Sequence, residues 1–162
     1  MSAYNLHSAS RADAVGTFDS GGRTFKVYNG AQSWSDARAF CISQSMDLAT
    51  ITSEAQTVAV CDAVGSTAAN FWVGATDAGE EGNWKWVNGW PWAYTRWGPN
   101  QPDDCCSNSI PHQEDCLMIW CNPPDPREHK SWNDAGCSLQ YGFVCSAPLS
   151  PGEPLRPGAQ AP

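Results

Sequence analysis

The sequence predicts a single α+β domain stabilised by disulfides, on three observations. The chain has 162 residues, a length that one hydrophobic core commonly fills. Two segments with helical periodicity are followed by several short aromatic strands, which indicates helices packed against sheet. The chain also has eight cysteines and no Cys-x-x-Cys pair, which favours disulfides in an oxidising compartment.

The predicted core spans residues 23–146, between two polar segments. Residues 1–22 are typical of a flexible arm, and the Pro-rich residues 147–162 are typical of a tail or linker. The chain contains no apolar run suited to a signal peptide or to a membrane span of ~20 residues. We therefore expect a secreted or extracellular domain cut from a longer chain, without membrane insertion.

The first strand and the first helix are predicted from local patterns. Residues 23–30 alternate apolar and polar side chains and end in Asn-Gly, which predicts a strand and a turn. Residues 33–46 predict a helix with Ser33 as a possible cap, and they place four side chains on one helical face: Trp34, Ala37, Cys41 and Ile42.

A second helix is predicted over residues 52–65, because Ser53 and Gln56 form a capping box and Gly65 closes the segment. Short strands are expected at residues 70–77, 83–89, 116–120 and 141–145. Turn-forming residues dominate between Trp90 and Asn133. A loop of that length inside a compact domain is disordered or functional.

The charge balance favours cations or neutral polar ligands. Seventeen acidic residues against nine Lys and Arg give a net charge of −8, which argues against nucleic acid and anionic membranes as partners. Acids gather in residues 97–116, where they repel one another unless a cation compensates. Together with the amides of Asn100, Gln101 and Asn133 they are hard oxygen ligands, which suit calcium better than magnesium or zinc. A solvated acidic loop is the alternative.

Proline adds a second feature to this loop. In Gln101-Pro102-Asp103 the Gln-Pro bond can be cis, which would turn both flanking side-chain oxygens toward one point. An ordinary proline turn is the alternative.

Seven motifs together resemble the C-type lectin-like domain in their order and rough spacing: WSDARAFC, FWVGATD, WKWVNG, QPDD, EDC, WNDAGC and YGFVC. The resemblance covers residues 23–146. It implies two helices, two small antiparallel sheets and a long loop region that carries calcium and ligand. It also implies two disulfides, Cys41–Cys145 and Cys116–Cys137.

The resemblance further implies two calcium sites. The sugar-binding site would use Gln101, Asp103, Glu114, Asn133 and Asp134. A second site would use Asp77, Glu81, Asp104, Glu114 and Asp115, with Glu80 competing with Glu81. In members with the first site, two sugar hydroxyls complete the calcium shell, and Gln-Pro-Asp resembles the galactose and N-acetylgalactosamine class. The expected partners are glycans with those terminal sugars, bound multivalently through tandem domains or oligomers.

The chain departs from the family at its remaining cysteines. Cys105 stands where galactose-type members usually carry a sugar-stacking ring. Either stacking is lost, or His112, Trp90 or Trp92 supplies the ring. Burial in the loop's own core is the alternative for both tryptophans. Cys105 and Cys106 are expected to take different partners. Cys121 is expected to pair with one of them, and Cys61 either pairs with the other or stays free.

Other functions receive less support from the residues. His112, His129 and the surplus cysteines match no zinc spacing, and no arrangement of nucleophile, acid and base indicates an enzyme. The same fold also serves as a protein-interaction module or, in fish antifreeze relatives, adsorbs to ice. Those relatives share Gln-Pro-Asp, but an ice binder is expected to have a flat, Thr-rich face, whereas this loop is acidic and Trp-rich.

Overall fold

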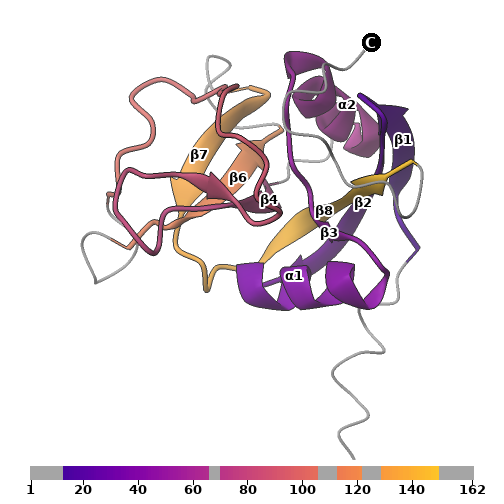
Figure 1. Cartoon of the computed structure of the whole chain (residues 1–162), viewed down its shortest axis with the longest axis horizontal. Helices are drawn as coiled ribbons and strands as arrows, with labels where there is room; N and C mark the ends of the chain where they lie inside the picture. Colours follow the sequence, from indigo (N-terminus) through magenta and orange to yellow (C-terminus); the bar gives the residue numbers. More distant parts are fainter. Residues whose placement is uncertain (1–12, 66–69, 106–112, 122–128, 150–162) are drawn as a thin grey trace, which may run out of the picture.

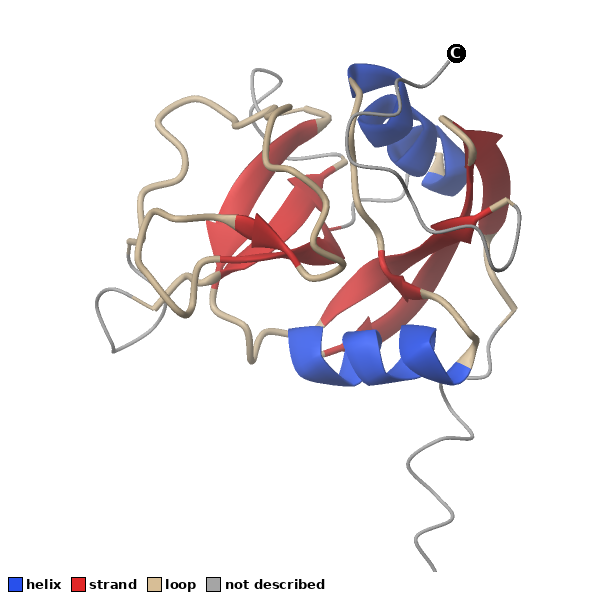
Figure 2. Cartoon of the chain, in the orientation of Figure 1, coloured by secondary structure: helices blue, strands red, loops and turns tan. Residues whose placement is uncertain are grey.

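The computed structural model describes residues 13–65, 70–105, 113–121 and 129–149 (Figure 1). It is an α+β fold in which both helices come between strands in the first half of the chain (Figure 2). The helices are α1 (Trp34–Ser43) and α2 (Glu54–Val64). The strands are β1 (Gly16–Ser20), β2 (Arg23–Gln32), β3 (Asp47–Leu48), β4 (Asn70–Thr76), β5 (Lys85–Trp86), β6 (Cys116–Trp120), β7 (Ser131–Ala135) and β8 (Tyr141–Pro148).

Both helices begin at the serines that the sequence indicates. The Ser33 hydroxyl accepts a hydrogen bond from the Asp36 amide at 3.2 Å, and the Ser53 hydroxyl accepts one from the Gln56 amide at 3.3 Å. Each serine thereby satisfies an amide that has no partner inside its helix. The second helix ends at Gly65, whose φ of 66° is the left-handed conformation that glycine adopts without strain.

The buried face of α1 differs from the predicted one at Ile42, which is 55% exposed. Ala37, Phe40 and Cys41 are buried instead, and the Phe40 ring packs edge-on against Tyr28 and Phe143. Residues three and four positions apart share a helix face, so Phe40 and Cys41 lie below Ala37. Ile42 is rotated one further position, toward solvent.

The strands form one connected sheet in the order β1-β2-β8-β4-β6-β7. Antiparallel pairs make up two groups, β1-β2-β8 and β4-β6-β7, on the right and left of Figure 1. Short parallel pairing of Phe71 and Trp72 in β4 with Gly142 and Phe143 in β8 joins the groups. The two small antiparallel sheets that were expected are therefore continuous.

The folded region starts before residue 23. Strand β1 lies inside the expected flexible arm and pairs with β2 along its full length. The Phe18 ring stacks on Phe25, with ring centroids 4.9 Å apart. At the other end β8 reaches Pro148, which pairs with Arg23. The predicted boundaries of the core are thus too narrow at both ends, because β1 and the end of β8 add to the same sheet.

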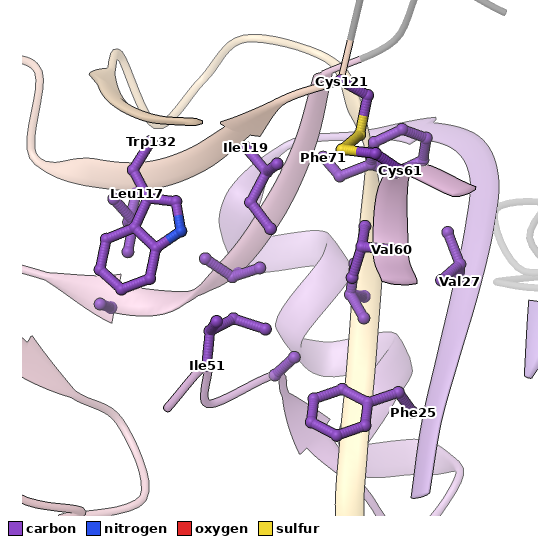
Figure 3. Packing of buried hydrophobic residues seen from close by; sticks show 14 of the residues in the cluster. Phe25, Val27, Ile51, Val60, Cys61, Phe71, Leu117, Ile119, Cys121 and Trp132 are labelled. Atoms are coloured by element: carbon purple, nitrogen blue, oxygen red, sulfur yellow. A yellow bond between two sulfur atoms is a disulfide. The ribbon is translucent and has the colours of Figure 1, made fainter. Parts of the chain in front are cut away.

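Three disulfides join described cysteines, and two of them start from a helix. The predicted bonds Cys41–Cys145 and Cys116–Cys137 are confirmed. A third bond joins Cys61 in α2 to Cys121, directly after β6, within the main hydrophobic core (Figure 3).

The expected pairing of Cys121 with Cys105 or Cys106 is therefore wrong, because the fold places α2 against the end of β6. Cys105 is also disulfide-bonded. Cys106 and His112 lie outside the described residues.

Candidate calcium-binding site

A cluster of tryptophans packs against the long loop between β5 and β6. Trp84 and Trp86 are buried, and the Trp92 ring lies 5.1 Å from Trp86 and 5.9 Å from Trp132, measured between centroids. Trp90 is half-buried against the same core. The interpretation of Trp90 and Trp92 as loop-core residues is thus confirmed.

Backbone hydrogen bonds dock this loop on β7. The Trp132 amide donates to the Arg96 carbonyl at 2.7 Å, and the Gly98 amide donates to the Trp132 carbonyl at 2.8 Å. The Trp132 indole N–H in turn donates to the Thr57 hydroxyl of α2 at 3.1 Å. The loop is thereby aligned with β7 just before the Gln101-Pro102-Asp103 segment, whose Gln-Pro bond is cis.

Asp134 in β7 holds that segment in place. This carboxylate is 1% exposed, and its two oxygens accept the amide N–H groups of Asp103 at 3.2 Å and of Asp104 at 2.7 Å. Oxygens of Asp103, Glu114 and Asp134 lie within 4.8 Å of one another. We call these three residues the first cluster.

Two amide oxygens adjoin the first cluster in sequence and lack partners. Gln101 Oε1 and Asn133 Oδ1 are buried and accept no hydrogen bond in the described part of the chain. A buried carbonyl oxygen without a partner costs free energy unless a donor or a cation satisfies it. Together with the three carboxylates, these oxygens form a donor set that suits a hard cation such as calcium.

The charges of the first cluster are poorly compensated by the protein itself. Burial, followed by the charges of Asp134 and Asp103, raises the pKa of Glu114 to about 7. Burial also raises the pKa of Asp134, against the opposing effect of the amide N–H groups of Asp104 and Asp103. Simultaneous ionisation of the cluster is therefore costly without a cation.

A second cluster consists of Asp77, Glu81 and Asp115, whose oxygens also lie within 4.8 Å of one another. Asp77 follows β4 and is 3% exposed. Its Oδ2 accepts the Gly82 amide N–H at 2.8 Å, whereas its Oδ1 is buried and has no hydrogen-bond partner among the described residues. Burial, then the charges of Asp77 and Asp104, raises the pKa of Glu81 and of Asp115.

The structure distinguishes Glu81 from Glu80. The Glu80 carboxylate accepts a hydrogen bond from the Asn83 side-chain amide at 2.8 Å and does not belong to the second cluster. Glu114, which was expected to serve both sites, lies in the first cluster alone.

Asp104 belongs to neither cluster. Its Oδ1 accepts the Glu114 amide N–H at 3.1 Å, and its charge raises the pKa of Glu81, Glu114 and Asp115. Its predicted place among the ligands of the second site thus differs from the observed grouping. Its carboxylate also supports the Glu114 backbone, and its role as a calcium ligand stays a prediction.

Thr76 is a positioning residue that the sequence analysis missed. Its hydroxyl donates to the Asp115 carbonyl at 2.6 Å, which the Asp77 amide also approaches at 3.3 Å. These bonds fix the strand entering β6 beside the end of β4 and so bring Asp115 to Asp77. The available signal was its position directly before Asp77, at the end of a predicted strand.

The family model of the lectin C-type domain matches residues 30–147. This chain belongs to the C-type lectin domain family. Over 116 residues, or 69% of the chain, it is 34% identical to C-type lectin domain family 4 member F of Mus musculus. This C-type lectin domain spans only 19% of that relative's length.

Solved structures share the fold. The carbohydrate-recognition domain of the mouse scavenger receptor C-type lectin is 25% identical, with a TM-score of 0.69 covering 83% of this chain and 96% of that one. A calcium-independent type II antifreeze protein is also 25% identical, with a TM-score of 0.67 covering 82% and 92%. Within the described part of this C-type lectin domain, no helix is long and apolar enough to cross a membrane.

The difference between Glu80 and Glu81 leads to a paired prediction for this C-type lectin domain. Glu81→Gln is expected to weaken calcium binding at the second cluster about fivefold, since it removes one of three clustered carboxylates at an exposed position. Glu80→Gln, its matched control, should leave the affinity unchanged. Calorimetric titration of both variants with calcium measures the effect, and equal affinities for the two would contradict the assignment of Glu81.

Proposed function

We propose that this C-type lectin domain binds carbohydrate through a calcium ion held at the first cluster. The observation that carries the proposal is the pair of buried, unpartnered oxygens, Gln101 Oε1 and Asn133 Oδ1, which adjoin the three clustered carboxylates in sequence. A solvated acidic loop would leave such oxygens exposed to water. We further propose that the second cluster holds a second calcium ion, because Asp77 Oδ1 is likewise buried without a partner.

The proposed roles follow from the chemistry of the side chains. The carboxylates of Asp103, Glu114 and Asp134 and the amide oxygens of Gln101 and Asn133 would hold the ion. When bound, calcium supplies coordination positions that two neighbouring sugar hydroxyls can complete. The carboxylate of Glu114 can accept a hydrogen bond from a sugar hydroxyl, and the side-chain amides of Gln101 and Asn133 can donate hydrogen bonds to hydroxyl oxygens. Charge-assisted hydrogen bonds of this kind select the geometry of the hydroxyl pair.

The proposed sugar class is galactose and N-acetylgalactosamine, because Gln101 and Asp103 form the motif of that class. Trp90 and Trp92 pack in the loop core, and Cys105 is held in a disulfide. We therefore propose that recognition depends on hydroxyl geometry more than on ring stacking. Affinity for a single sugar would then be weak, and strong binding would require several domains acting together.

A glycan array in the presence of calcium, repeated with a chelator, tests this function. We expect the array to show binding to glycans with terminal galactose or N-acetylgalactosamine, and the chelator to remove it. Calorimetry with galactose and mannose then measures selectivity, with galactose bound at least about tenfold more tightly, the equivalent of ~1.4 kcal/mol. Sugar binding that survives chelation, or a preference for mannose, would contradict the proposal.

The similarity to a calcium-independent antifreeze protein supports a second candidate, adsorption to ice. Under that alternative, thermal hysteresis would be measurable with and without chelator. A protein-interaction module is the third possibility, and it predicts calcium binding with an empty glycan array. We favour sugar binding because acidic side chains gather in the two clusters, whereas an ice binder is expected to have a flat, Thr-rich face.

The cellular context is proposed on the same grounds. The three disulfides between described cysteines are typical of secreted or cell-surface domains. We propose an extracellular binding domain without catalytic activity, which meets its glycans outside the cell or on cell surfaces.

A further inference from the structure

A buried arginine lies on the side of the domain away from the long loop, where β2 begins and β8 ends (Figure 1). Arg23 is 5% exposed. Its Nε and Nη2 donate to the Ser146 hydroxyl oxygen at 3.3 and 2.9 Å. Its Nη1 is buried without a hydrogen-bond partner among the described residues. Burial lowers the pKa of Arg23, yet a guanidinium remains charged at neutral pH. This charge is only partly satisfied.

The nearby carboxylate already serves another arginine. The charge of Asp47 acts on Arg23, but Asp47 Oδ1 and Oδ2 accept bonds from Arg38 Nε and Nη2 at 3.1 and 3.3 Å. Among the described residues, two guanidinium groups therefore share the Asp47 carboxylate, and the positive charge of Arg23 is only partly compensated.

Thr50 and Ser146 add two further donors at the same place. Thr50 is 0% exposed, and its hydroxyl has no partner in the described structure. Its backbone amide donates at 3.3 Å to the Ser146 hydroxyl oxygen, which is the same oxygen that Arg23 bonds. Since the Ser146 oxygen accepts bonds from both residues, its own proton is left for an acceptor.

We propose that Arg23, Thr50 and Ser146 bind a small inorganic anion such as chloride, which stabilises the fold. The unpartnered donors of Arg23 and Thr50 are linked through the Ser146 hydroxyl, beside a positive charge that is only partly compensated. An anion can accept hydrogen bonds from all three residues. A water molecule would accept about two hydrogen bonds and would still have to donate its own protons. The low exposure of the three residues, 5%, 0% and 1%, restricts the occupant to a small ion.

The binding of this anion would couple three segments: the start of β2, the residues after β3 and the end of β8. An anion that binds only the folded state raises stability by mass action. The melting temperature should therefore rise with chloride concentration, and above the dissociation constant it should keep rising in proportion to the logarithm of that concentration. This role is independent of the proposed sugar site, so either one can fail alone.

Thermal melts of the full chain test the proposal at constant ionic strength and saturating calcium. Chloride is replaced stepwise by methanesulfonate, a much larger anion. We expect a rise of roughly 4 °C for a tenfold excess of chloride over its dissociation constant. Thr50→Val should abolish most of the rise. Thr24→Val, whose half-exposed hydroxyl bonds Asp19, is the matched control and should retain it.

Arg23→Met should likewise lose the chloride response, provided that circular dichroism shows it folded; Thr50→Val decides the test if it does not. Bromide soaked into crystals should give an anomalous peak between Arg23, Thr50 and Ser146. Equal melting temperatures in the two salts, an unchanged response in Thr50→Val, or density at that position without anomalous signal would overturn the proposal.

Discussion

Replacing Asp103 with asparagine is expected to weaken calcium binding at the first cluster by roughly 100-fold and to abolish calcium-dependent sugar binding. Asp103 supplies one of the three clustered carboxylates and is exposed at the surface. Its attachment to Asp134 runs through the backbone amide, so the substitution leaves the position of the segment intact. Calorimetric titration with calcium, followed by galactose, measures both losses.

The stability of the calcium-free protein separates this effect from unfolding. The charge of Asp103 raises the pKa of Glu114 and of Asp134, so removing it relieves repulsion. Calcium-free Asp103→Asn should therefore melt at or slightly above the temperature of the unaltered protein. Asp13→Asn, at an exposed acid outside both clusters, is the control for a general change in charge. Unchanged calcium affinity in Asp103→Asn would contradict the role of the first cluster.

Local patterns predicted the features that depend on neighbouring residues. Ser33 and Ser53 cap their helices, and each side-chain oxygen lies only three residues from the amide that it satisfies. The pairing of Cys61 with Cys121 depends on the packing of α2 against the end of β6, which no short-range pattern records. The exposure of Ile42 likewise depends on which helix face meets the sheet.

The candidate site shows the same division. The sequence shows which residues carry oxygen ligands, and the resemblance indicates which of them group together. The sequence does not show which of these oxygens lack partners, because that depends on burial. Burial in turn depends on the packing of the loop against the tryptophan cluster and along β7. Asp104 illustrates the limit: its residue type suits a ligand, and only the structure shows that its Oδ1 accepts the Glu114 amide N–H.

In the calcium-free protein, the stability of the fold is expected to decrease as the pH rises from 4.5 to about 7. Glu114 has a pKa of about 7 in the folded protein, against an ordinary value of 4.5. Between these values the folded chain binds more protons than the unfolded chain, so raising the pH favours unfolding. The raised pKa values of Asp134 and Asp115 act in the same direction.

A shift of this size corresponds to about 3 kcal/mol for a fully buried group, and solvent screening of the half-exposed Glu114 reduces it to about 1–2 kcal/mol. Urea denaturation of calcium-free protein at several pH values measures the free energy of unfolding, and Glu114→Gln should flatten the profile. Saturating calcium should reverse the slope, because the metal binds deprotonated carboxylates and competes with protons. If the calcium-free protein instead gained stability between pH 5 and 7, the protein itself would compensate the charge of Glu114. The proposal of a cation at the first cluster would then lose its electrostatic basis.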